Sequence, residues 1–185
     1  MNLPDRNRSE FSLSAARNHL ARTPAVLDTW LRDLPEEWAR ANEGGESWSP
    51  CDVVGHLIHG EKTDWIPRLT RILEHGTGVP FEKFDRFAQF RDSEGKALGE
   101  LLDEFARRRA ESLRALDGLA LDSAALDRQG RHPILGEVTA RQLLATWVAH
   151  DHDHIVQIAR VIAAQYAEEV GPWRQFLRVI SGQPG

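Results

Sequence analysis

Residues 147–157 read WVAHDHDHIVQ, so three histidines alternate with two aspartates in the middle of a long amphipathic pattern. The apolar residues around them recur at the spacing of a helix, in which residues four apart lie on the same face. His150 and His154 therefore point the same way, and they fall on the stripe that should be buried. Because a buried polar group is costly unless it is satisfied, this pair requires an explanation.

Outward from this stretch, apolar residues at helical spacing predict an all-α fold, a four-helix bundle with additional short helices. The long helices are expected at about 23–34, 50–74, 92–116 and 139–166, and short helices at about 12–20, 81–90 and 172–180. The joins are long enough for a crossover connection. Residues 117–137 read as irregular, and no strand of useful length is expected.

Several residues mark where these helices begin or bend. Thr23-Pro24 and Ser49-Pro50 each pair an N-cap residue with a proline at the first helical position, so each predicts a new helix. Thr139 with Gln142 matches a capping box. Pro67 is expected to kink the second long helix, because its ring clashes with the preceding turn. Residues 1–9 are expected to form a flexible tail before a single domain at 10–185.

Composition excludes several classes of protein. With 185 residues, a net charge of -5 and a pI near 5.9, the chain lacks the basic surface of a nucleic-acid-binding protein. The run Arg107–Arg109 is flanked by Glu104 and Glu111 and reads as a solvated helix face. No apolar run is long enough to span a membrane, and no signal-peptide core is present. A single cysteine fits a reducing, cytoplasmic location.

The histidine pair is a good two-point platform for a divalent metal. A tight site needs a third ligand, and His56 is the best candidate because it lies on the inward stripe of another long helix. Three imidazoles with one or more waters would be an open, catalytic type of coordination. Imidazoles suit Zn, Ni, Fe or Cu, and nitrogen ligands alone do not choose among them. The alternative is a set of ordinary core histidines with hydrogen-bond partners.

Two further residues are candidates for contact with a substrate or a water. Glu61, five residues after His56, is a candidate general base or an outer contact of the site, with an ordinary helix carboxylate as the alternative. Gln157, three residues after His154, is placed to hydrogen-bond a bound water or substrate. His59 is expected to point outward or to support a ligand. His152 is expected to be off the ligand face and exposed.

Other polar residues near the motifs are weaker candidates. Asp151 and Asp153 are expected to be rotated away from the ligands, toward solvent or a neighbouring ring. Cys51 lies in a first helical turn, where the helix dipole favours a thiolate, but it is off the ligand face. His132 precedes the last long helix and reads as a turn residue, with a role at the rim of the site as the alternative.

Three stretches together resemble the DinB and YfiT-like family. They are WSP at 48–50 with VVGHL at 53–57 and Glu61, then HPILGEVT at 132–139, and HDHDHIVQI at 150–158. In that family two histidines four apart are followed by a Gln-Ile pair, and GPW at 171–173 is also similar to its ending. The resemblance covers about residues 24–180.

The resemblance implies a four-helix bundle with a three-histidine metal site. Matching positions give His56, His150 and His154 as ligands of Zn, Ni or a similar divalent ion, often in a homodimer. Characterised relatives include metal-dependent transferases and isomerases that use a low-molecular-weight thiol such as mycothiol or bacillithiol. His152, between the two ligand histidines, is a competing donor, and no thiol-binding motif is recognisable in this sequence.

Three hypotheses follow for the function. The first is a metal-dependent enzyme, a thiol transferase or hydrolase, acting on a small-molecule substrate with no nucleic acid or membrane as partner. The second is a non-catalytic, stress-response bundle that binds a metal or small ligand. The third is a plain bundle with satisfied core histidines and no metal.

Overall fold

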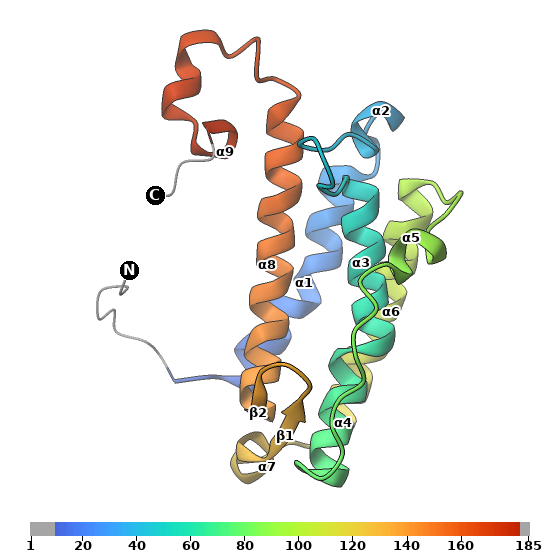
Figure 1. Ribbon diagram of the computed structural model, residues 1–185, viewed down its shortest axis with the longest axis vertical. Helices are drawn as coiled ribbons and strands as arrows, with labels where there is room; N and C mark the ends of the chain where they lie inside the picture. Colours follow the sequence, from blue (N-terminus) through green and yellow to red (C-terminus); the bar gives the residue numbers. More distant parts are fainter. Residues whose placement is uncertain (1–9, 182–185) are drawn as a thin grey trace.

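Four long helical segments lie side by side in the computed structural model, which describes residues 10–181 (Figure 1). They are α1 (Leu13–Leu31), α3 with α4 (Pro50–Thr63 and Trp65–His75), α6 (Leu98–Gly118) and α8 (Ala140–Ala164). The shorter elements are α2 (Glu36–Ala39), α5 (Ala88–Asp92), α7 (Ser123–Asp127), β1 (Gln129–His132), β2 (Gly136–Thr139), the 3-10 helix η1 (Gly171–Phe176) and α9 (Arg178–Ser181). The predicted four-helix bundle with short helices is confirmed. The predicted tail at 1–9 lies outside the described residues.

The chain reaches its third long helix by a crossover. In Figure 1, α1 and α8 run up the bundle, whereas α3 with α4 and α6 run down it. Residues 76–97 therefore return along the length of the bundle before α6 begins, and α5 lies on this return path. The crossover that the long joins allowed is present, and it brings Phe84 against His56 and His59 in α3.

Two predicted helix starts are confirmed by their capping contacts. The Ser49 side chain accepts from the Asp52 backbone N–H and the Asp52 carboxylate accepts from Ser49 N, with Pro50 at the first helical position. Thr139 and Gln142 form the same reciprocal pair at the start of α8. Each cap satisfies backbone donors that a helix start leaves free, and together they place the two helices that carry the histidines.

The predicted break at Thr23-Pro24 is wrong, because α1 runs without interruption through Pro24 from its N-cap Ser12. A proline inside a helix leaves the carbonyl four residues earlier without its N–H partner. Here that carbonyl belongs to Leu20, and it accepts instead from Arg109 Nη1 at 2.8 Å. A contact from another helix thus replaces the hydrogen bond that Pro24 removes.

The second long helix is broken rather than only kinked, which corrects the prediction of one helix over 50–74. It ends at Thr63 and restarts at Trp65, and Asp64 between them has φ -110° and ψ -69°. The ring of Pro67 would clash with the Thr63 carbonyl in a continuous helix. The break therefore falls one turn before the proline, beside the cavity described below.

The third long helix begins at Leu98, later than the predicted 92–93. Gly95 adopts φ +74°, which a helix does not allow, and the Glu100 carboxylate accepts from Ala97 N at 2.8 Å to cap the new start. One face of α6 is buried in the bundle. That face comprises Leu98, Leu101, Leu102, Phe105, Arg109, Ser112, Leu113 and Leu116.

A short hairpin occupies part of the region that the sequence left irregular, so the expectation of no strand is wrong. Strands β1 and β2 pair antiparallel from Gln129↔Thr139 to His132↔Gly136. Four-residue strands hold too few side chains for an alternating pattern to show. Gly130 is required here, because a Cβ on it would lie 2.6 Å from Ile72 Cγ1 in α4.

The apolar core falls into two clusters with a polar layer between them. One cluster includes Leu27, Leu57, Phe105 and Ile158, and the other includes Leu20, Leu69, Leu113 and Trp147. Between them along each helix lie buried polar side chains, namely Thr23, His56, His59, Glu61, Asp64, Arg109, Asp151 and His154. This polar layer crosses the middle of the bundle, and His56, Asp64 and His154 from it also line the candidate site.

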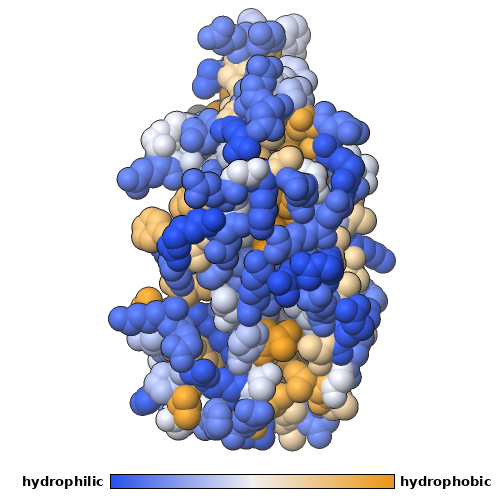
Figure 2. All heavy atoms as spheres, turned by 90° about the vertical axis from the view of Figure 1, so that its right-hand side faces the viewer, coloured by the Kyte–Doolittle hydropathy of each residue, from blue (hydrophilic) through white to orange (hydrophobic). Residues whose placement is uncertain are grey.

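Figure 2 shows one face that is largely hydrophilic, with apolar patches that are most evident toward its lower end. Within residues 10–181, no helix combines the length and apolarity that crossing a bilayer requires.

Candidate metal centre

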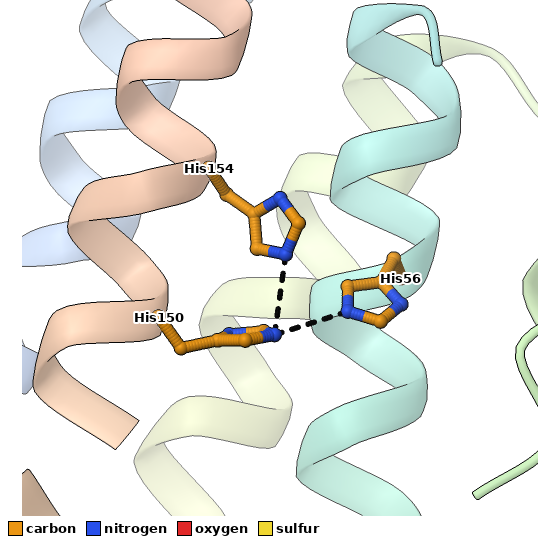
Figure 3. A group of neighbouring side chains, drawn as sticks. All are labelled: His56, His150 and His154. Carbon is orange, nitrogen blue, oxygen red and sulfur yellow. Dashed lines mark hydrogen bonds between the residues drawn. The ribbon is translucent and has the colours of Figure 1, made fainter. Parts of the chain in front are cut away.

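Three histidine side chains converge between α3 and α8 (Figure 3). His56 comes from α3, and His150 and His154 lie one turn apart on α8. The Nε2 atom of His150 lies 3.1 Å from Nε2 of His56 and 3.2 Å from Nε2 of His154. One donor atom from each residue lies within 4.8 Å of the other two. The arrangement brings together the three residues that the sequence selected, although His56 and His150 are 94 positions apart in the sequence.

The outward-facing ring nitrogens are held by amide groups. His154 Nδ1 lies 2.9 Å from Gln157 Oε1, and His56 Nδ1 lies 3.4 Å from Gln89 Oε1 on α5. Since an amide oxygen only accepts, each Nδ1 must carry the proton in these contacts. The Nε2 atoms of His56 and His154 then present lone pairs to the centre. His150 Nδ1 is buried and has no hydrogen-bond partner among residues 10–181.

The surroundings keep these imidazoles neutral. Burial, followed by the neighbouring His154, lowers the pKa of His56 to about 4. Burial, followed by the charges of His154 and His56, lowers the pKa of His150 to about 3. Burial also lowers the pKa of His154, while the hydrogen bond that His154 Nδ1 donates to Gln157 Oε1 opposes this shift. At neutral pH all three rings are therefore uncharged, with one ring nitrogen free of a proton, which is the form that binds a metal.

The histidines form one wall of a cavity of about 380 Å³. Its lining residues are Trp48, His56, Gly60, Asp64, Trp65, Phe84, Arg86, His150 and His154. The Trp48 ring is stacked on His154 at an interplanar angle of 13°, and the Phe84 ring meets His56 edge-on at 5.4 Å. The cavity therefore has aromatic walls beside a cluster of three nitrogen donors, with Asp64 and Arg86 as its charged groups.

A buried ionic network lies beneath the histidines. Arg109 Nη1 and Nη2 donate to the two carboxylate oxygens of Asp151 at 2.7 and 2.9 Å, and Arg109 Nε donates to Glu61 Oε1 at 3.0 Å. Trp147 Nε1 donates to the same Glu61 oxygen at 3.1 Å. Burial lowers the pKa of Arg109, but Asp151 and Glu61 raise it by more, so the guanidinium stays charged. The network joins α6 to both helices that carry the histidines.

This network corrects two expectations. Asp151 is not turned toward solvent but is 1% exposed, and it also accepts from Thr23 Oγ1 at 2.6 Å. Arg109 does not belong to a solvated face with Arg107 and Arg108, because it too is 1% exposed. Arg109 lies on the apolar stripe of α6, and this position indicates burial. The run of three arginines led instead to the prediction of a solvated face.

Gln157 and Glu61, the two residues predicted to contact a substrate or a water, lie in different surroundings. Gln157 supports a ring, since its amide oxygen holds His154 Nδ1. The Glu61 carboxylate binds Arg109 and Trp147, and burial raises its pKa against the opposing charge of Arg109. Glu61 is not among the described residues that line the cavity.

The remaining histidines stay apart from the cluster. His152 is exposed as expected, and its Nδ1 lies 2.7 Å from the Val148 carbonyl, so it does not compete as a ligand. His59 does not point outward: it is buried, with its ring edge-on to Phe84 at 4.9 Å. His132 Nδ1 accepts from the backbone N–H groups of residues 134 and 135, which confirms the turn role.

The surroundings of Cys51 also differ from the prediction of a favoured thiolate. It is buried, and burial raises the pKa of its thiol to about 11 despite the nearby charge of Arg40. Desolvation therefore outweighs the effect of the helix start, and the thiolate is disfavoured.

Sequence reasoning missed several residues that build the cavity. Gln89 and Arg86 lie on the crossover, whose pattern of phenylalanines predicted a short helix at 81–90. The helix is confined to α5, and Phe84 reaches the cavity from the irregular segment before it. Asp64 and Trp65 come to the cavity because of the break before Pro67. Only a tertiary arrangement brings these segments together.

Comparison with known proteins agrees with this fold. The DinB superfamily model matches residues 19–158. The chain is similar to the structure described as "YfiT from Bacillus subtilis is a probable metal-dependent hydrolase with an unusual four-helix bundle topology", with a TM-score of 0.71 and 20% identity over 90% of this chain and 93% of that one. It is also similar to TT2238, described as a four-helix bundle protein, with a TM-score of 0.52 and 20% identity over 83% of this chain and 98% of that one. No match was found among curated proteins. Because the family match spans most of the sequence and includes all three clustered histidines, the chain belongs to the DinB superfamily.

Proposed function

We propose that this protein is a metal-dependent enzyme, of hydrolase or thiol-transferase type, that acts on a small molecule. The observation that carries the proposal is the convergence of three neutral imidazoles on the wall of a cavity. A plain core would give each buried ring a separate partner, whereas here the three Nε2 atoms face one another. His56, His150 and His154 are the proposed ligands.

The donor set fits a divalent ion such as Zn or Ni. Two nitrogens bound to a tetrahedral zinc at about 2.0–2.1 Å lie about 3.3 Å apart, and the Nε2 separations here are 3.1 and 3.2 Å. A cation between the three Nε2 atoms would accept a lone pair from each neutral ring. Three protein ligands leave a coordination position open, and a bound divalent ion would lower the pKa of a water or thiol held there.

The other cavity residues provide proton transfer and exclude water. Asp64 is the carboxylate among the described residues of the lining, and burial raises its pKa to about 6 against the ion pair with Arg68. A group whose pKa is near neutrality exchanges protons readily at working pH. Trp48 and Phe84 cover the histidines and reduce the access of water. Gln157 and Glu61 act outside the cavity, by holding His154 and the Arg109 network in place.

Hydrolysis and thiol transfer both use a nucleophile activated at such a centre. The description of YfiT as a probable metal-dependent hydrolase supports the first reaction. The resemblance described above supports the second, with a low-molecular-weight thiol as cosubstrate. A cytoplasmic location, which the single cysteine favours, and a homodimer complete the proposal. Light scattering after size-exclusion chromatography measures the oligomeric state.

Metal analysis of protein purified without a histidine tag tests the proposal. We expect about one divalent ion per chain after reconstitution with Zn or Ni, and loss of that ion in His150→Ala. His152→Ala is the matched control, since it removes a nearby exposed histidine of the same helix. Equal metal content in both variants would contradict the ligand assignment, and no bound metal in the unchanged protein would contradict the proposed function.

A further inference from the structure

The cavity beside the histidines has aromatic side chains in its lining. Trp48, Phe84 and Trp65 contribute to its lining, and the rings of Trp48 and Trp65 each lie against a cluster histidine. Its volume of about 380 Å³ is at the small end of ligand sites. These walls suit a planar apolar group of about the size of one or two rings.

Arg86 places a positive charge at this cavity. Its side chain belongs to the lining, and among residues 10–181 it forms no ion pair with a carboxylate. The neighbouring Arg91 is paired with Asp85 at 2.6 Å, and Asp64 in the lining is paired with Arg68. The charge of Arg86 therefore remains available to a molecule in the cavity.

Trp65 adds a second donor. Its side chain is 4% exposed, and its indole Nε1 makes no hydrogen bond to any other described residue. Nε1 lies 3.2 Å from the point that a Cβ on Gly60 would occupy, and Gly60 is part of the cavity wall. Because Trp65 belongs to the cavity lining, its indole N–H can donate to an acceptor on a ligand in the cavity.

We propose that the substrate carries a carboxylate on a flat apolar body, with Arg86 and the Trp65 indole N–H as the groups that hold the carboxylate. The planar guanidinium matches a carboxylate through two parallel hydrogen bonds. The apolar body then lies among the aromatic rings, beside the three histidines. This inference rests on the proposed function for its chemistry, but the two donors belong to the protein and do not require a metal.

The test compares paired probes that differ in charge but hardly in size or shape. Phenylacetate and phenylacetamide have the same ring and nearly the same size, and ligand-observed NMR titrations give the affinity of each for metal-free and Zn-loaded protein. We expect phenylacetate to bind about tenfold more tightly than the amide in both forms, the advantage of a hydrogen bond to a charged group. Phenyl phosphate, a third probe, shows whether the site prefers another oxyanion; tighter binding of it than of phenylacetate would overturn the assignment to carboxylates.

Matched variants test which residues cause the preference for the carboxylate over the amide. Arg86→Gln should reduce the tenfold preference to less than about threefold, and Trp65→Phe, which keeps the ring but removes the N–H, should reduce it in part. Arg91→Gln is the control, because Arg91 is an arginine of the same segment that is already paired with Asp85. Equal affinity for acid and amide, or a preference that survives Arg86→Gln, would overturn the inference. A preference found only with Zn would also overturn it, whereas absence of metal binding would overturn the proposed function alone.

Discussion

Each cluster histidine has a different degree of support at its outward nitrogen. Gln157 holds His154 at 2.9 Å, Gln89 contacts His56 at 3.4 Å, and His150 Nδ1 has no partner among the described residues. A hydrogen bond to this nitrogen fixes the tautomer and the orientation of a ligand ring. At the residue scale, the metal affinity of the site should therefore depend on two glutamines that do not touch the proposed ion.

Substitution of Gln157 tests this dependence. We expect Gln157→Leu to weaken Zn binding about tenfold, in the usual range for loss of such a contact, because the His154 ring loses its restraint. Gln89→Leu should have a smaller effect, since its contact is longer. Competition with a chromophoric chelator measures the affinities. Gln165→Leu, at the end of the same helix, is the control, and an equal loss there would refute a specific role for Gln157.

At the element scale, helix α8 presents polar side chains to three neighbouring helices. His150 and His154 face α3, while Asp151 between them faces Arg109 on α6 and Thr23 on α1. The same Arg109 binds Glu61 on α3 and the Leu20 carbonyl that Pro24 leaves free. One guanidinium thus links all four segments of the bundle at the level of the site.

Loss of this guanidinium should be costly. Arg109→Met leaves Asp151 and Glu61 buried without a counter-charge, which destabilises a protein by about 3–5 kcal/mol. Urea unfolding followed by circular dichroism measures the free energy of unfolding. Arg107→Met is the control from the same run of arginines: that side chain is 54% exposed, and its pair with Glu111 should be worth less than about 1 kcal/mol. Similar losses in both variants would contradict a special role for the buried network.

A second link between elements should depend on pH. The Glu104 carboxylate of α6 binds Lys96 and Lys62, each at 2.9 Å, and these contacts lower its pKa to about 2. Because the folded pKa is below the ordinary value, the stabilisation is complete above about pH 4.5 and is lost as the pH falls toward 2.

We therefore expect Glu104→Gln to lower the free energy of unfolding by about 1 kcal/mol at pH 7, with a smaller difference at pH 3. Urea titrations at the two pH values measure it. The control is Glu94→Gln, an exposed carboxylate with no ion pair in the part of the chain that the structure describes. A Glu104→Gln effect that is the same at both pH values would show that the contact is not ionic.

At the scale of the whole molecule, regular helices and the three histidines followed from the sequence, because each depends on spacing along one element. The buried face of α6 and the caps of α3 and α8 are examples. Features that depend on contact between distant segments could not be predicted from the sequence. Pro24 stays inside α1 because Arg109 reaches across from α6, and the crossover brings Gln89 and Arg86 to α3.

The proposed ion would also act on the stability of the entire bundle. His56 and His150 are 94 positions apart, so the complete site exists only in the folded chain. A ligand that binds only the native state stabilises it by about 2.7 kcal/mol at a free concentration of 100 times its Kd. For a protein of this size each kcal/mol raises Tm by about 2–4 °C, so Zn should raise Tm by about 5–10 °C.

Differential scanning calorimetry with and without Zn measures this shift. His56→Ala should abolish it, because one of the two helices then loses its only proposed ligand, whereas His152→Ala should retain it. Magnesium should produce no comparable shift, since it prefers oxygen ligands. A Zn shift that persists in His56→Ala would mean that the ion binds elsewhere on the surface, and the three-histidine cluster would then not be the site that couples metal binding to folding.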